Sequence, residues 1–206
     1  MAKKNIGENT APGFLRKLAK LLVIGGLIGL AAAFILTVEK IEIIKDPSFQ
    51  PSCNINPIIS CGSVMTTPQA EVFGFPNSLL GIIGFTAVAV TGIAILAGAA
   101  FRRWYWLALN FGLLLAAIFV HWLIYQTIYN IGALCPYCMV VWTVTIPLFW
   151  YVTLYNIRTG ALRLPVQLRG AAAFARRHHG DILILWFLGV LAMITTHFWY
   201  YWETLI

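Results

Sequence analysis

The sequence predicts an all-α integral membrane protein with five transmembrane helices. Of its 206 residues, 60% are hydrophobic and only 10% are charged, and its mean hydropathy is +0.82. Soluble domains usually carry about 25% charged residues, so this composition excludes a soluble fold. Five apolar stretches are long enough to cross a bilayer, which takes about 20 apolar residues per helix. The lysines and arginines lie between these stretches, which predicts a defined orientation.

The five apolar stretches are separated by polar or charged segments. They cover residues 21–38, 79–101, 104–128, 136–155 and 182–202. The first follows Lys17 and Lys20, as a secretory signal would, but its 18 residues exceed the usual signal core of about 7 to 15. We therefore predict that it is retained as a helix. Gly25 and Gly29 lie four residues apart in it, which predicts close packing against a neighbouring helix.

The positive charges predict how the chain crosses the membrane. Twelve of the 14 lysines and arginines fall before the first stretch, between the second and third, or between the fourth and fifth. The opposite side carries Lys40 and Lys45. Positive charges accumulate on the cytoplasmic side, so we predict a cytoplasmic N-terminus and an external C-terminus. All four cysteines then lie on the external side, where disulfides form and persist.

This topology divides the chain into four parts. We expect a cytoplasmic tail over residues 1–20, four spanning helices over 21–155 with an external loop over 39–76, a basic cytoplasmic loop over 156–181, and a fifth helix over 182–206. The net charge of +7 does not indicate nucleic acid as a partner. The basic residues form no groove interleaved with aromatic side chains of the kind that single strands require.

The motif Cys135-Pro136-Tyr137-Cys138 opens the fourth stretch. Proline is favoured at the first position of a helix, so Cys135 is expected at the N-cap and Cys138 about one turn deeper. The positive end of the helix dipole favours thiolates at this place. We expect one sulfur to face water and the other to face the bilayer, which would make a redox centre at the membrane surface.

The external loop carries the second pair, Cys53 and Cys61, in a segment that is unusually apolar for a loop. We expect this segment to lie as a lid on the mouth of the bundle, with its cysteines within reach of Cys135 and Cys138. A backbone held in the membrane interface must satisfy its hydrogen bonds. A short helix and hydroxyl groups are expected to do so, the latter from Ser60, Ser63, Thr66 and Thr67.

Four external cysteines allow three interpretations. A relay between the two pairs would make the chain a thiol–disulfide oxidoreductase, because exchange proceeds by attack of a thiolate on a disulfide. Four thiolates could instead bind zinc, but the oxidising compartment and the seven residues between Cys53 and Cys61 argue against this, and no metal is expected. The third interpretation is a scaffold or small transporter held by structural disulfides. The absence of Asp, Glu, Lys and Arg from the five stretches disfavours transport.

Three segments follow one another in a specific order. They are the run Cys53-Asn-Ile-Asn-Pro-Ile-Ile-Ser-Cys61-Gly-Ser-Val-Met, the helix entry Phe73-Gly-Phe-Pro-Asn77-Ser-Leu-Leu-Gly81, and Cys135-Pro-Tyr-Cys138. This order resembles the vitamin K epoxide reductase family, in its bacterial branch, over about residues 21–155. DsbB-type quinone reductases also carry two external cysteine pairs, but in them the Cys-x-x-Cys pair comes first.

The resemblance implies a four-helix bundle around a quinone, with the fifth helix peripheral and the cysteine-bearing loop as a lid. It implies that Cys138 lies beside the quinone, that Cys135 is its exchanging partner, and that Cys53 and Cys61 accept electrons from a substrate protein. Trp142 stands where the vertebrate members have a tyrosine. The residues implied near the quinone are Asn77, Trp142, Thr67, Ser63 and Met65. The family places one hydroxyl near the active centre, and either Thr67 or Ser63 could supply it.

The resemblance also implies the cofactor and partners. The quinone would be of the menaquinone, ubiquinone or vitamin K type, and electrons would come from a secreted, DsbA-like thiol oxidase with a thioredoxin fold. We expect that partner to be a separate protein, because no thioredoxin-like domain follows the fifth helix before Ile206. The expected location is a bacterial cytoplasmic membrane, with the protein multi-pass in the lipid bilayer. Reduction of vitamin K quinone or its epoxide is the alternative physiological role.

Some residues keep two interpretations at this point. Asn77 follows Pro76 at the start of the second span, where it could equally be a helix N-cap. His121, near the external end of the third span, is expected to be a polar residue satisfied by a neighbour, with proton transfer as the alternative. Either Cys53 or Cys61 could be the loop cysteine that exchanges with Cys135.

Overall fold

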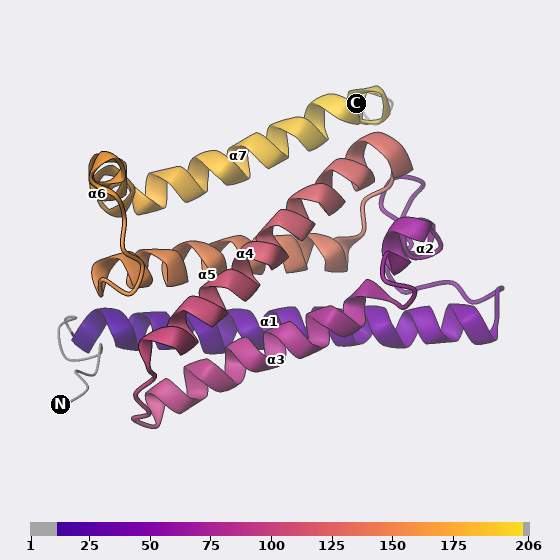
Figure 1. The fold of residues 1–206 in the computed structure, drawn as a ribbon. Coiled ribbons are helices and arrows are strands. Elements are labelled where there is room, and N and C mark those ends of the chain that lie inside the picture. Colours follow the sequence, from indigo (N-terminus) through magenta and orange to yellow (C-terminus); the bar gives the residue numbers. More distant parts are fainter. Residues whose placement is uncertain (1–11, 204–206) are drawn as a thin grey trace.

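The computed structural model describes residues 12–203, and this part of the chain is built from helices and their connections. Five helices are long and apolar enough to cross a membrane: Gly13–Lys45, Asn77–Leu96, Arg103–Ile131, Pro136–Arg158 and His179–His197. They run lengthwise through the molecule, and the cysteine-bearing loop lies at one end (Figure 1). The predicted all-α membrane fold with five spanning helices is confirmed.

Helix α1 (Pro12–Lys45) and helix α3 (Asn77–Leu96) pack side by side (Figure 1). Gly26 permits this close approach, because a Cβ added there would lie 2.8 Å from the backbone nitrogen of Ala89. A Cβ on Gly29 would overlap an aromatic ring of α3. The predicted close packing of the first helix is therefore present, and in part it brings backbone against backbone.

Helix α4 (Arg103–Tyr125) continues into a π-helical turn, η3 (Gln126–Ile131), and α5 (Pro136–Arg158) then packs against both α4 and α1. At the end far from the cysteines, the buried Asn156 amide donates a hydrogen bond of 3.0 Å to the carbonyl oxygen of Trp106. This bond ties α5 to α4. The four helices α1, α3, α4 and α5 form the bundle.

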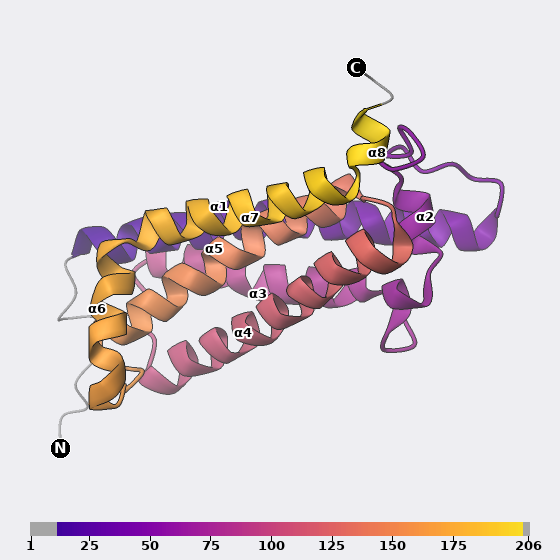
Figure 2. The ribbon, with the colours of Figure 1, turned by 90° about the horizontal axis from the view of Figure 1, so that it is seen from above.

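Helix α7 (His179–His197) lies on the outside of the bundle, beside α5 (Figure 2). Leu185 on this helix is 72% exposed, as expected where an apolar side chain faces lipid. His121 connects α7 to α4, because its Nε2 accepts a hydrogen bond of 2.8 Å from Trp186 Nε1. The Nδ1 of His121 lies 2.7 Å from the Ala117 carbonyl oxygen. His121 is thus satisfied by its neighbours, and α7 is the peripheral fifth helix.

The basic segment between α5 and α7 folds at the same end of the molecule as the start of α1 (Figures 1 and 2). It contains a 3₁₀ turn, η4 (Val166–Leu168), and the helix α6 (Arg169–Arg177). The four-residue helix α8 (Trp199–Trp202) follows α7 at the opposite end. The chain therefore separates its arginine-rich connections from its cysteines by the full length of the bundle.

The lid comprises residues 46–76 and contains the short helix α2 (Cys61–Met65) and a 3₁₀ turn, η2 (Pro68–Glu71). Ser60 caps α2 by accepting a hydrogen bond of 3.2 Å from the Ser63 amide. The hydroxyls of Thr66 and Thr67 donate to carbonyl oxygens about one turn back. The predicted short helix and hydroxyl contacts are thus present.

A short parallel bridge joins the lid to the segment that precedes α5. The Ser60 amide donates to the carbonyl oxygen of Leu134 at 2.9 Å, and the Leu134 amide donates to that of Ile58 at 2.6 Å. Ser60 directly precedes Cys61, and Leu134 directly precedes Cys135. The bridge therefore brings the second loop cysteine next to the first cysteine of α5.

Several boundaries differ from those predicted, most of all at the first and last spans. Helix α1 extends beyond residues 21–38 at both ends, so the lid begins at residue 46 rather than 39. Charged residues at both ends stay helical, because hydropathy marks the hydrocarbon layer while a helix can continue through the interface. The last span, predicted as 182–202, is divided between α7 and α8. Residues 1–11 of the predicted tail lie outside the described residues.

Candidate functional site

Cys53 and Cys61 of the lid form a disulfide, with their Cα atoms 5.6 Å apart. Side chains rather than regular structure order the loop around them. Asn54 Oδ1 accepts hydrogen bonds from the Gly62 amide at 2.9 Å and from the Ser60 hydroxyl at 3.1 Å. Together with the bridge to Leu134, these bonds hold both sulfur atoms in a fixed place above α5.

Cys135 is the N-cap of α5 and Pro136 is its first residue, as predicted. The Sγ of Cys135 accepts a hydrogen bond of 3.4 Å from the Cys138 amide and lies 3.2 Å from Cys61 Sγ. The prediction that one sulfur of this pair faces water is wrong, because Cys135 has no exposed surface. The lid covers Cys135, whose sulfur faces the loop disulfide instead.

The thiol of Cys135 ionises more readily than that of an ordinary cysteine. A hydrogen bond from the Cys138 thiol is the largest cause that lowers the pKa of Cys135, and the backbone amides of Cys138 and Tyr137 lower it further. Burial and the Glu39 carboxylate oppose this shift without reversing it. While the loop disulfide is closed, Cys135 is therefore the prepared nucleophile, and Cys61 is the sulfur that it faces.

Cys138 lies one turn into α5 and lines a cavity of about 1040 Å³. This volume is at the upper end of the range of about 300 to 1,000 Å³ for small-molecule sites. The walls come from α1, α3, α4 and α5, and residues of the lid close one end. Apolar side chains make up most of the lining, among them Leu36, Phe85, Leu113, Phe119 and Val141. The cavity suits a flat apolar ligand with few polar atoms.

Four of the five residues expected near a quinone line this cavity: Asn77, Trp142, Thr67 and Met65. The structure separates the fifth, Ser63, from them. Ser63 lines a small polar hollow on the lid, and its hydroxyl lies 2.8 Å from that of Ser60. Of the two hydroxyls that the sequence left undistinguished, Thr67 is the one at the cavity, where its Oγ1 donates to the Val64 carbonyl oxygen at 2.8 Å.

Trp142 is buried in the cavity lining, and its Nε1–H has no hydrogen-bond partner. Within residues 12–203, one other buried side-chain nitrogen or oxygen, Asn156 Oδ1, is also unpaired. An unpaired buried donor costs about 1 to 3 kcal/mol. A free donor in the lining of a large cavity therefore indicates a ligand that can accept a hydrogen bond from it.

Asn77 is the first residue of α3, and Pro76 occupies the N-cap position, so the Asn77 side chain does not cap the helix. It ties the lid to α3 instead. Its Nδ2 donates to the Gln69 carbonyl oxygen at 2.7 Å, and its Oδ1 accepts from the Val72 amide at 3.2 Å. Because an amide nitrogen carries two hydrogens, a second N–H is left for a ligand in the cavity.

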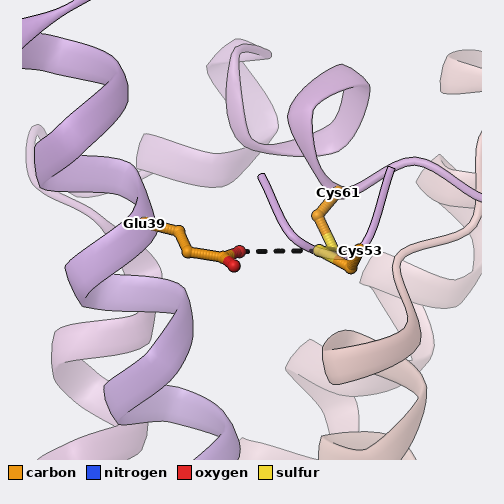
Figure 3. A group of neighbouring side chains, drawn as sticks. All are labelled: Glu39, Cys53 and Cys61. Carbon is orange, nitrogen blue, oxygen red and sulfur yellow. Dashed lines mark hydrogen bonds between the residues drawn. A yellow bond between two sulfur atoms is a disulfide. The ribbon is translucent and has the colours of Figure 1, made fainter. Parts of the chain in front are cut away.

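In the sequence, Glu39 and Lys40 are two charges directly after the first apolar stretch, and the structure places both at the site. Lys40 lines the cavity, donates to the Met65 carbonyl oxygen at 2.7 Å and pairs with Glu71 at 2.8 Å. Glu39 lies beside the loop disulfide (Figure 3). Both are buried. Their position in the sequence could have indicated this, because two charges directly after an apolar run become buried when the helix continues beneath a lid.

The ligand atoms of Glu39, Cys53 and Cys61 lie within 4.8 Å of one another, which is the spacing of a metal site. Two of these atoms are joined in the disulfide. Thiolates are the species that bind zinc, and a disulfide offers none. The cluster in this state is therefore a redox centre with a carboxylate beside it.

A sulfur atom that faces a disulfide, next to a cavity inside a membrane bundle, is the arrangement of a membrane oxidoreductase that works by thiol–disulfide chemistry. Comparison with family models agrees with this class. The model described as "Vitamin K epoxide reductase family" matches residues 20–153. The chain belongs to this family, whose members are oxidoreductases associated with quinones and thioredoxin-like partners. A comparison with curated proteins gave no match.

Proposed function

We propose that the protein is a thiol:quinone oxidoreductase that supports disulfide formation outside the cytoplasm. It takes two electrons from a secreted thioredoxin-fold protein at Cys53 and Cys61, passes them to Cys135 and Cys138, and delivers them to a quinone. The observation that carries this proposal is the separation of 3.2 Å between Cys61 Sγ and Cys135 Sγ. A relay requires one sulfur of each pair to reach the other pair, and these two sulfurs are already neighbours.

Accessibility suggests the order of the exchanges. Cys53 retains 6% exposure, whereas Cys61 and Cys135 have none. A partner thiolate therefore attacks Cys53, and Cys61 leaves as a thiolate. Cys61 then attacks Cys135 of the Cys135–Cys138 disulfide, and Cys138 leaves as a thiolate.

Two further exchanges complete the transfer. The second thiol of the partner attacks its own sulfur in the bond to Cys53, which releases the oxidised partner and leaves Cys53 reduced. Cys53 then attacks Cys61, closes the loop disulfide and frees Cys135. Two electrons have passed from the partner to Cys135 and Cys138, which is the state seen in the structure, with Cys53 and Cys61 bonded and the other two cysteines free.

The residues of the cavity fit a quinone. When bound, a quinone supplies an acceptor for two electrons and two protons and leaves as the quinol. Trp142 Nε1–H and the second Asn77 N–H are the donors that would hold its carbonyl oxygens and stabilise negative charge on them. Cys138 is the cysteine in the lining, so its sulfur would be the one next to a quinone held there.

The distribution of charge supports one orientation. The arginines of the α3–α4 connection and of α6 lie at the end where α1 begins, and the lid lies at the opposite end (Figure 1). We place the basic end in the cytoplasm and the disulfide outside a bacterial cytoplasmic membrane. An oxidising compartment is where Cys53 and Cys61 would meet a secreted thiol oxidase.

Trapping the bond between the two pairs tests the proposal. In the variant Cys138→Ser, Cys135 attacks Cys61, and Cys138 is no longer present to resolve the product, so only the reverse attack by Cys53 competes with it. We expect a Cys61–Cys135 disulfide and a free Cys53, identified by mass spectrometry of peptides under non-reducing conditions. In the matched control Cys135→Ser, the Cys53–Cys61 disulfide should persist. If Cys138→Ser also keeps Cys53–Cys61 closed at equilibrium with a reduced thioredoxin-fold protein, the two pairs do not communicate and the relay is wrong.

A further inference from the structure

Glu39 lies near the lid end of α1, next to the loop disulfide (Figure 3). It is buried, with 7% exposure. Its Oε2 lies 3.5 Å from Cys53 Sγ, and its Oε1 accepts hydrogen bonds from the Ser52 amide at 3.1 Å and the Ser52 hydroxyl at 2.5 Å. The residue that precedes Cys53 thus holds the carboxylate against the sulfur of Cys53.

The closed disulfide does not explain why a carboxylate is buried here. Burying an ionised carboxylate is costly unless it is paired. The nearest lysines along the chain are paired elsewhere, Lys40 with Glu71 and Lys45 with Glu42, both at 2.8 Å. A disulfide sulfur has no hydrogen to donate, whereas the thiol of reduced Cys53 has one. The arrangement is therefore suited to the reduced state of Cys53.

We propose that Glu39 is the catalytic base of the loop pair, an inference that rests on the relay proposed above. When Cys61 is bonded to Cys135, Cys53 must lose its proton before it can attack Cys61. Glu39 accepts that proton. The bond between Cys53 and Cys61 forms, the bond between Cys61 and Cys135 breaks, and Cys135 leaves as a thiolate with the electron pair. One carboxylate charge disappears as one thiolate charge appears, so the step is balanced.

The charge of Glu39 couples the two halves of this step. The ionisable groups that face Glu39 are Cys53 and Cys61 on the lid and Cys135 and, through Ser52, Tyr137 on α5. The negative carboxylate works against the Cys135 thiolate. Proton transfer to Glu39 removes that repulsion at the moment when Cys135 must leave as a thiolate. The same transfer therefore activates the nucleophile and improves the leaving group.

Ser52 gives the proton an exit from the buried site. Its side chain is exposed at the surface of the lid. Its hydroxyl donates to Glu39 and lies 3.4 Å from the phenolic oxygen of Tyr137. A hydroxyl can accept and donate at the same time, so Ser52 can pass the proton of Glu39 to external water.

A single-turnover experiment with the full chain in phospholipid vesicles tests this role. The protein is fully reduced, freed of reductant and mixed with menadione, a soluble naphthoquinone, and the thiols are labelled with a maleimide at successive times. Cys135 and Cys138 should supply the first pair of electrons, and Cys53 and Cys61 should supply the second pair through the relay. Glu39→Gln keeps the size of the side chain and an oxygen that can accept both Ser52 hydrogen bonds. The matched control is Glu42→Gln, one turn away on α1 and paired with the exposed Lys45.

We expect Glu39→Gln to leave the first phase unchanged and to slow the second at least about 10-fold at neutral pH. The wild-type second phase should vary less with pH around neutrality, because Glu39 takes the proton of Cys53. The Glu39→Gln rate should instead rise with pH as Cys53 ionises unaided, so the two rates converge in alkali. Glu42→Gln should match the wild type at every pH.

The outcomes separate this inference from the relay itself. If the wild type shows no second phase, the relay is wrong. If the wild type shows both phases and Glu39→Gln has the same second phase and pH profile, the role of Glu39 is wrong. If Glu39→Gln loses the first phase as well, its fold is damaged and Glu39→Asp decides. That variant keeps a carboxylate and should restore part of the second phase, and a Glu39→Asp rate equal to the Glu39→Gln rate would overturn the inference.

Discussion

The two cysteine pairs of this protein lie in different chemical environments, although one sulfur of each is only 3.2 Å from the other. The loop pair, Cys53 and Cys61, has polar neighbours, namely the Glu39 carboxylate of α1 and the Asn54 amide of the lid. Cys138 instead lines an apolar cavity. Cys61 and Cys135 lie at the boundary, both without exposed surface.

This difference separates two tasks that conflict in one place. In the proposed mechanism, proton transfer needs a base and a path to water, which Glu39 of α1 and Ser52 of the lid would provide. The proposed apolar electron acceptor needs an apolar cavity with few donors, and the bundle has such a cavity beside Cys138. Electrons would pass between the two environments by exchange of disulfide bonds.

Replacing a cysteine of either pair should have the largest effect on electron transfer. Cys135→Ala should reduce electron transfer from a protein dithiol to menadione by at least about 100-fold, because Cys61 then has no sulfur to exchange with at the start of α5. Cys53→Ala should reduce steady-state transfer from the protein dithiol to menadione by a similar factor. It should preserve the first single-turnover phase, in which Cys135 and Cys138 supply the electrons. The measurement is quinone absorbance in vesicles. A Cys135→Ala variant that still transfers electrons from the protein dithiol to menadione at the wild-type rate would contradict the relay.

Replacing each of two tryptophans tests the role of the apolar cavity beside Cys138. Trp142→Phe removes the unpaired N–H, so we expect the KM for the quinone to rise about 5- to 10-fold, as for one lost hydrogen bond, with thermal stability unchanged or slightly higher. Trp150→Phe is the control, since its Nε1 donates to the His179 carbonyl oxygen at 3.1 Å. It should lower the unfolding free energy by about 1 kcal/mol and leave the KM unchanged. Equal KM values for the two variants would remove Trp142 from the quinone site.

Two lysines on α1 give the smallest effects and test how the lid is held over the cavity. Lys40→Met loses the hydrogen bond to Met65 and the pair with Glu71, which is partly exposed, so we expect a loss of about 1 to 2 kcal/mol. Lys45→Met loses an exposed pair with Glu42 and should cost at most about 0.5 kcal/mol. Thermal unfolding and proteolysis of the lid measure the difference. Equal stability of the two variants would show that Lys40 does not fasten the lid.

Local patterns predicted much of the fold. Five apolar runs were sufficient to place five spanning helices, because each must satisfy its backbone hydrogen bonds internally and cover the hydrocarbon layer. Proline after Cys135 fixed the start of α5 to the residue, because proline fits the first turn of a helix. Helix ends were less accurate, as α1 shows, because hydropathy reports the membrane and not the helix.

The site was predicted only in part. The four cysteines, Asn77 and Trp142 were identified from motifs, and the structure brings Asn77 and Trp142 to one cavity with Cys138. The sequence could not separate Thr67 from Ser63, because their directions depend on how α2 and η2 turn within the lid. Glu39 was missed because its proposed role depends on its contact with Cys53, which lies 14 residues further along the chain.

The sequence alone determined the membrane fold, the side on which the cysteines gather and the pairing chemistry available to them, since these follow from hydropathy, charge and residue type. Only the tertiary structure decided that Cys61 rather than Cys53 faces Cys135. The reason is the bridge between Ser60 and Leu134, which aligns the residues that follow them. Contacts between segments more than 70 residues apart depend on the register of the lid on the bundle, and that register is a property of the packed molecule.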